Sequence, residues 1–117
     1  MINAKIVRDL SGRIIGFTVK NHGESITCAA VSMLVLNTVN SIETFLPDEG
    51  IIYEYNETDG YLTFSLIDPA SRSDGMGLLL DTMFLGLVGT KNEYPDEIEL
   101  EQVFELPSEV TRKETLA

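Results

Sequence analysis

The amino-acid sequence predicts an α+β fold of two layers, in which a mixed or antiparallel sheet of about five strands carries two helices on one face. Two observations support this prediction. Short segments alternate between apolar and polar residues, as strands do, and two longer segments repeat their apolar residues at helical spacing. The expected order along the chain is β-β-α-β-β-α-β.

The first predicted element is a hairpin. Residues 2–9 and 14–20 alternate roughly between apolar and polar side chains, and Ser11 with Gly12 favours a turn between them. The second strand ends close to His22.

A long helix is predicted next, over residues 26–46. We expect Ser25 to cap its N-terminus by accepting a hydrogen bond from an amide of the first turn, and Pro47 to end it. Its apolar residues share one narrow stripe at about 100° per residue, which predicts a buried face. That stripe consists of Cys28, Val31, Val35, Val39, Ile42 and Leu46.

A second hairpin is predicted from residues 51–55 and 61–67, which are rich in Ile, Tyr and Phe. The loop between them, residues 56–60, ends in Asp-Gly, a pair that favours hairpin turns.

The second helix follows the polar residues 69–74, in which Ser71 and Asp74 have the spacing of a capping box. Helical periodicity continues to about Lys91. The predicted buried face consists of Met76, Leu79, Leu80, Met83 and Leu87.

Tyr94-Pro95 interrupts this helix, and residues 97–104 alternate well enough for a fifth strand. The sequence therefore predicts one domain over residues 1–104. Residues 105–117 have mixed charge and little to bury, so we expect a loose tail.

Apolar residues outside the two helical stripes exceed what one sheet face can cover, and homodimerisation is the simplest explanation. These residues are Met33, Leu34, Leu36, Phe84 and Leu85.

The composition excludes several classes of protein. The 117 residues include 8 Lys+Arg, 19 Asp+Glu, one Cys and one His, and the formal net charge is −11. One cysteine and one histidine cannot form an internal disulfide or a Cys/His zinc cage. The N-terminal residues lack the pattern of a signal peptide, and no run of about 18 apolar residues predicts a membrane span, so we expect a cytoplasmic protein.

The charge of −11 makes nucleic-acid binding improbable and favours a basic partner. The acidic side chains near the C-terminal end alternate along the last predicted strand, which favours a solvated face over a metal site. They are Asp96, Glu97, Glu99 and Glu101.

One pair of residues has the chemistry of a nucleophilic site. Cys28 lies in the first turn of the predicted long helix, and His22 lies six residues earlier. Helix N-termini favour a thiolate, and the free amides of Cys28 and Ala29 could stabilise an oxyanion. Two alternatives stay open: Cys28 as a small core residue, and Ser32 bonded near the thiol or back to the Cys28 carbonyl.

Residues 26–32, Ile-Thr-Cys-Ala-Ala-Val-Ser, and the apolar helix after them resemble the signature of the ribosomal-processing cysteine protease family, Prp. The resemblance extends to about Phe104. It implies that Cys28 is the nucleophile, His22 the general base and Ser32 a residue near the site, with no cofactor. It also implies a small cytoplasmic dimer that removes the N-terminal extension of large-subunit ribosomal protein twenty-seven, a basic protein, after a hydrophobic stretch.

The sequence departs from the family pattern between the two catalytic positions. The family separates histidine from cysteine by about twelve residues, whereas six separate them here, and Ser25 replaces an aspartate. An extended four-residue link still reaches roughly 13 Å, so contact between the two side chains is possible. The shorter loop leaves a second hypothesis, a non-catalytic dimeric module that binds a peptide or a ribosomal partner.

Overall fold

The computed structural model describes residues 1–20, 26–58 and 60–105, which form the predicted order β-β-α-β-β-α-β. Both predicted helices and all five predicted strands are confirmed, with ends that differ by one or two residues. The elements are β1 Ile2–Arg8, β2 Ile14–Lys20, α1 Ile26–Phe45, β3 Ile51–Asn56, β4 Tyr61–Leu66, the short 3₁₀ helix η1 Pro69–Ser71, α2 Asp74–Glu93 and β5 Ile98–Phe104.

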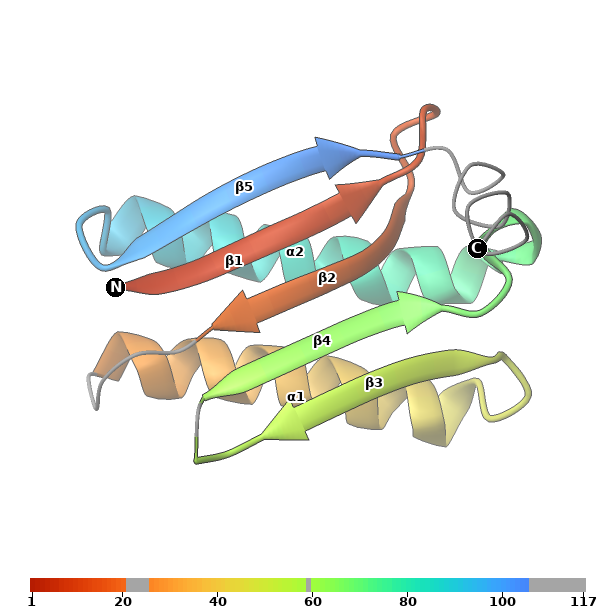
Figure 1. Ribbon diagram of the computed structural model, residues 1–117, viewed down its shortest axis with the longest axis horizontal. Coiled ribbons are helices and arrows are strands. Elements are labelled where there is room, and N and C mark those ends of the chain that lie inside the picture. The colour runs from red at the N-terminus through yellow and green to blue at the C-terminus, as the bar shows by residue number, and fades with distance from the viewer. Residues whose placement is uncertain (21–25, 59, 106–117) are drawn as a thin grey trace, which may run out of the picture.

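The strands form one mixed sheet in the order β3-β4-β2-β1-β5. The two hairpins pair antiparallel and β2 joins them by pairing with β4, whereas β5 lies parallel to β1 at the opposite edge from β3. Figure 1 shows both helices on the same side of this sheet, with α1 behind β3 and β4 and α2 behind the other three strands. The predicted two-layer α+β architecture is therefore confirmed.

The core lies between the sheet and the two helices. Alternate residues of each central strand point into it; in β1 these are Ile2, Ala4 and Ile6. The rings of Phe17 and Phe64 stack with their centroids 5.0 Å apart. Burial of each large apolar side chain contributes roughly 1.5–3 kcal/mol, which makes this interface the main source of stability.

The helices bury most of the stripes that their periodicity predicts, whereas Leu46, which follows α1, and Leu79 are half-buried. In α1 the buried residues are Thr27, Cys28, Val31, Val35, Thr38, Val39 and Ile42. In α2 they are Met76, Gly77, Leu80, Met83 and Leu87. By length and composition α1 is apolar enough to cross a membrane, which the sequence analysis did not expect, and 39% of this apolar window is buried in the fold.

The N-terminal cap of α2 differs from the prediction. Ser73, and not Ser71, is the N-cap, because its hydroxyl accepts a hydrogen bond of 3.0 Å from the amide of Met76. Glu49, from the loop before β3, fixes this cap by accepting hydrogen bonds from the amide and hydroxyl of Ser73. Ser71 instead ends η1, so the predicted capping box is wrong.

Candidate active site

Cys28 lies in the first turn of α1, at the end of the molecule where β1 begins and β2 ends (Figure 1). Its side chain belongs to the stripe that packs on the sheet and is 9% exposed. The sequence contains this one cysteine, and it forms no disulfide. A helix start is the position at which unpaired backbone amides favour a thiolate and can stabilise an oxyanion.

Two other predicted site residues lie on α1 close to Cys28. Ala29 follows it and is exposed, and Ser32 lies one turn later and is half-buried. Residues four apart share one face of a helix, so Ser32 lies beside Cys28, as the sequence predicts. His22 and the predicted cap Ser25 lie outside the described residues.

A carboxylate that the sequence analysis placed on a solvated face lies at the start of α1. The hydroxyl of Thr27 donates a hydrogen bond of 3.1 Å to Oε2 of Glu97, although 70 residues separate them in the chain. Thr27 is 1% exposed and Glu97 is half-buried. Because β5 begins at Ile98, Glu97 precedes the strand and does not belong to its alternating face.

Hydrogen bonds to backbone atoms hold the loop that carries Glu97. The amide of Glu97 donates to the carbonyl of Tyr94, and the carbonyl of Glu97 accepts from the amide of Ile2, both at 3.0 Å. The ammonium of Lys91 donates to the carbonyls of Pro95 and Ile98 at 2.9 and 2.8 Å. Glu97 therefore joins the start of α1 to the starts of β1 and β5.

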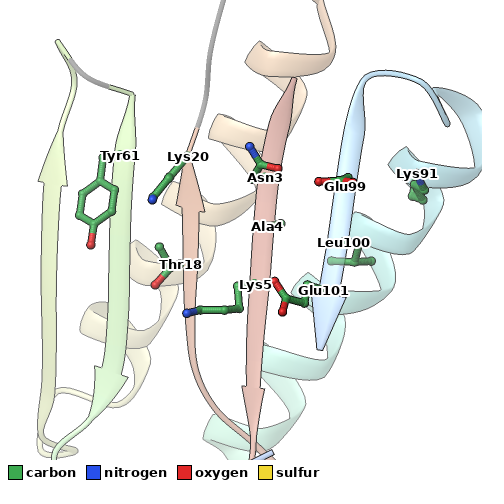
Figure 2. Close-up of a pocket in the computed structure, with 10 residues that line it drawn as sticks. All are labelled: Asn3, Ala4, Lys5, Thr18, Lys20, Tyr61, Lys91, Glu99, Leu100 and Glu101. Carbon is green, nitrogen blue, oxygen red and sulfur yellow. The ribbon is translucent and has the colours of Figure 1, made fainter. Parts of the chain in front are cut away.

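A hollow of about 840 Å³ lies over β1, β2, β4 and β5, and Lys91 of α2 also lines it. Figure 2 shows Lys5 and Lys20 on its central strands and Glu99 with Glu101 on β5. Glu99 and Glu101 thus occupy a solvent-facing surface, as predicted. Cys28 does not line this hollow, whereas Lys91, which bonds to the loop that carries Glu97, does.

Metal chemistry has no support in the described part of the chain. Within residues 1–20, 26–58 and 60–105, no group of three or more His, Cys, Asp and Glu side chains could hold a metal ion. The described groups at the start of α1 that are suited to chemistry include a thiol, backbone amides and a hydroxyl bonded to a carboxylate.

Comparison with protein families gives a match over residues 1–99 to the family described as "Cysteine protease Prp". This chain belongs to that family. It is a cysteine protease, and its family is one of ribosomal-processing enzymes. Prp membership was predicted from the Cys-Ala-Ala segment, and the match confirms it.

Solved structures agree with this assignment. The essential ribosomal processing protease Prp from S. aureus, in complex with a substrate peptide, is similar with a TM-score of 0.77 and 26% identity. The similarity covers 88% of this chain and 100% of that chain. The same S. aureus protein with a covalently linked product peptide matches equally well.

A Streptococcus mutans protein of known structure is also similar to this Prp family member, with a TM-score of 0.76 and 26% identity over 90% of this chain and 96% of that chain. No curated protein matches the chain.

Proposed function

We propose that this Prp family member is an endopeptidase that removes the N-terminal extension of large-subunit ribosomal protein twenty-seven during ribosome assembly, with Cys28 as nucleophile and His22 as general base. The observation that carries the proposal is that a cysteine protease needs a nucleophilic cysteine and the sequence contains one. Its position in the first turn of α1 supports the same role. The S. aureus relative, described as a ribosomal processing protease, supports the substrate class.

In the proposed mechanism, the Cys28 thiolate attacks the carbonyl carbon of the scissile peptide bond. The amides of Cys28 and Ala29 stabilise the negative charge that develops on the carbonyl oxygen. His22 gives a proton to the leaving amine as the C–N bond breaks, and a thioester remains on Cys28. Water then attacks the thioester while His22 accepts a proton from it, which releases the acid product and restores the Cys28 thiolate beside a protonated His22. These steps require no cofactor or metal.

The charge of the chain supports a basic substrate. A net charge of −11 attracts cationic polypeptides over several ångströms and repels nucleic-acid phosphates. The proposed partner is therefore the basic ribosomal protein itself, bound without direct contact to nucleic acid or a membrane. Such a substrate places the enzyme in the cytoplasm.

The proposed enzyme is a homodimer. Large apolar side chains of α1 and α2 remain exposed, which favours a partner surface on the helix layer. They are Ile26, Met33, Phe45, Leu78 and Leu85. Light scattering after size-exclusion chromatography tests the dimer, and the mass of a monomer, 13.0 kDa, at micromolar concentration contradicts it.

A second function is favoured by the burial of Cys28. At 9% exposure in a packed stripe, the thiol resembles a small core residue. The six-residue separation from His22 also favours a dimeric module that binds a peptide or ribosomal partner without cleaving it.

Peptide cleavage separates the two functions. A synthetic peptide that spans the N-terminal extension and the following residues of the ribosomal protein is incubated with the native chain, Cys28→Ala and Cys28→Ser, and the products are identified by mass spectrometry. Cleavage by the native chain alone is the expected result. If the native chain and Cys28→Ala both bind the peptide and neither cleaves it, the binding module replaces the protease.

A further inference from the structure

We propose that Glu97 is a positioning residue of this protease. Through the hydroxyl of Thr27, it holds the first turn of α1, and with it Cys28, against the starts of β1 and β5. This inference rests on the proposed role of Cys28 as nucleophile.

The partner of Thr27 is unusual among the helical threonines. Thr38, Thr82 and Thr90 each donate their hydroxyl to the carbonyl four residues earlier in their own helix, at 2.7–2.9 Å. Thr27 is the second residue of α1. Its buried hydroxyl is bonded instead to a carboxylate from a distant loop. The bond therefore fixes α1 relative to the sheet, which a bond within the helix does not do.

The loop that carries Glu97 is itself held by several hydrogen bonds. The backbone of Glu97 is bonded in both directions, to Tyr94 and to Ile2. The Lys91 ammonium bonds to the carbonyls on either side of Glu97, those of Pro95 and Ile98. A displacement of the first turn of α1 would therefore break the Thr27 hydrogen bond rather than carry the loop with it.

The position of this turn affects catalysis directly, because Cys28 and Ala29 supply the thiol and the amides of the proposed mechanism. A misplacement of about 1 Å in reacting groups can cost 100-fold in rate. A hydroxyl–carboxylate bond on the residue before the nucleophile restrains the backbone at the point where the geometry matters. Thr27 and Glu97 thus act through Cys28 and do not themselves contact the reacting atoms.

The negative charge of Glu97 can be tested separately from its hydrogen bond to Thr27. A carboxylate near a helix N-terminus stabilises the helix but disfavours a second negative charge at the same place, in this case a thiolate. Lys91, whose ammonium is held by backbone carbonyls, also lies at this end of the molecule, together with the carboxylate of Asp96 and the N-terminal ammonium next to Ile2. Glu97→Gln removes the charge and keeps an acceptor oxygen for Thr27, so it separates the effect of the charge from that of the hydrogen bond.

Four variants separate positioning from charge: Thr27→Val, Thr27→Ser, Glu97→Ala and Glu97→Gln. Each is assayed for alkylation of Cys28 by iodoacetamide between pH 5 and 9, for kcat/KM on the extension peptide, and for Tm. Thr27→Val and Glu97→Ala should each lower kcat/KM by about 10- to 100-fold. Thr27→Ser should stay within about 3-fold of native. Glu97→Gln, which keeps an acceptor oxygen for the Thr27 hydroxyl, should lose less kcat/KM than Glu97→Ala.

Two matched controls exclude general effects. Thr38→Val removes another buried threonine hydroxyl from the same stripe of α1, and Glu99→Gln removes an exposed carboxylate from β5. Both should react and cleave as the native chain does. The double variant Thr27→Val with Glu97→Ala should be no worse than either single variant, because the two residues form one interaction.

Alkylation keeps the test independent of the proposed substrate. If the native chain does not cleave the peptide, the proposed function fails, and the alkylation profiles still decide the role of Glu97. Native alkylation profiles in Thr27→Val and Glu97→Ala would overturn the inference. A double variant that loses the product of the two single losses would overturn it as well, because independent residues behave in that way.

Discussion

The two ends of this molecule are held by different kinds of contact. Where β1 turns into β2, one buried carboxylate, Asp9, accepts hydrogen bonds from the amide and hydroxyl of Ser11 and from the amide and Nε of Arg13. At the opposite end, where α1 begins, the bond between Thr27 and Glu97 joins residues 70 positions apart. The first end is closed by neighbours in sequence, and the second is assembled from distant segments.

This difference indicates that contacts of the β1–β2 turn contribute mainly to stability and that contacts at the start of α1 contribute mainly to activity. Burial alone would raise the pKa of the Asp9 carboxyl, but hydrogen bonds from Ser11 and Arg13 and the charge of Arg13 outweigh it and hold that pKa well below its usual range. The hydrogen bonds within this turn thus stabilise the ionised form of the Asp9 carboxyl. At the Cys28 end, the side-chain hydrogen bond of Thr27 comes instead from a residue in a distant part of the chain.

The largest expected effect is on activity at the Cys28 end. Cys28→Ala should reduce peptide cleavage by at least about 1,000-fold, because the covalent step is lost. The same variant should lower the free energy of unfolding by less than about 1.5 kcal/mol, because a single small side-chain atom is removed. Steady-state kinetics and urea denaturation measure the two quantities. Retained cleavage would remove Cys28 from the mechanism.

Asp9→Ala should give the opposite result, with stability lost and activity kept. Asp9 is 4% exposed, and its removal leaves the amides of Ser11 and Arg13 without their acceptor. We expect a loss of about 2–3 kcal/mol in the free energy of unfolding. Glu101→Ala, at an exposed position of β5, is the matched control and should change it by less than about 0.5 kcal/mol. Equal losses of unfolding free energy in Asp9→Ala and Glu101→Ala would show that the Asp9 carboxylate does not stabilise the turn.

The pH dependence of the free energy of unfolding tests whether the ionised Asp9 carboxylate stabilises the β1–β2 turn. The pKa of Asp9 is lowered from an ordinary value of 3.8 in the folded chain. A lowered folded pKa means that the stabilisation is fully present above the unfolded value and is lost as the pH falls below it. Native stability should therefore decline more steeply than that of Asp9→Asn between pH 4 and pH 2, as followed by urea denaturation. Parallel curves would show that Asp9 is not the group responsible.

The smallest expected effect concerns Gly12, which lies in the same turn with a φ of 90°. A Cβ at this position would meet no atom within 4 Å, so Gly12→Ala introduces backbone strain without a clash. The expected cost is about 1–2 kcal/mol. Thermal unfolding of Gly12→Ala beside Gly89→Ala, a position that is also open but helical, measures that strain. The helical variant should gain stability, and an equal loss in both would contradict the explanation.

Much of the fold could be predicted because its signals are local. The stripe from Cys28 to Ile42 repeats at helical spacing, and the hairpins alternate, so the elements are found within one or two residues of their predicted ends. The α2 cap was predicted wrongly at Ser71. Ser73 takes this role together with a bond to Glu49, a residue 24 positions away that local spacing does not reveal.

The candidate site divides in the same way. The sequence by itself determined that one cysteine lies at the start of a long apolar helix, that Ser32 follows on its face, and that the chain resembles Prp proteases. His22 as the base stays a prediction. The tertiary structure alone decided that β5 pairs parallel with β1 and that Glu97 reaches Thr27. Periodicity encodes which face a residue occupies, whereas a contact across 70 residues depends on how the whole chain closes around its core.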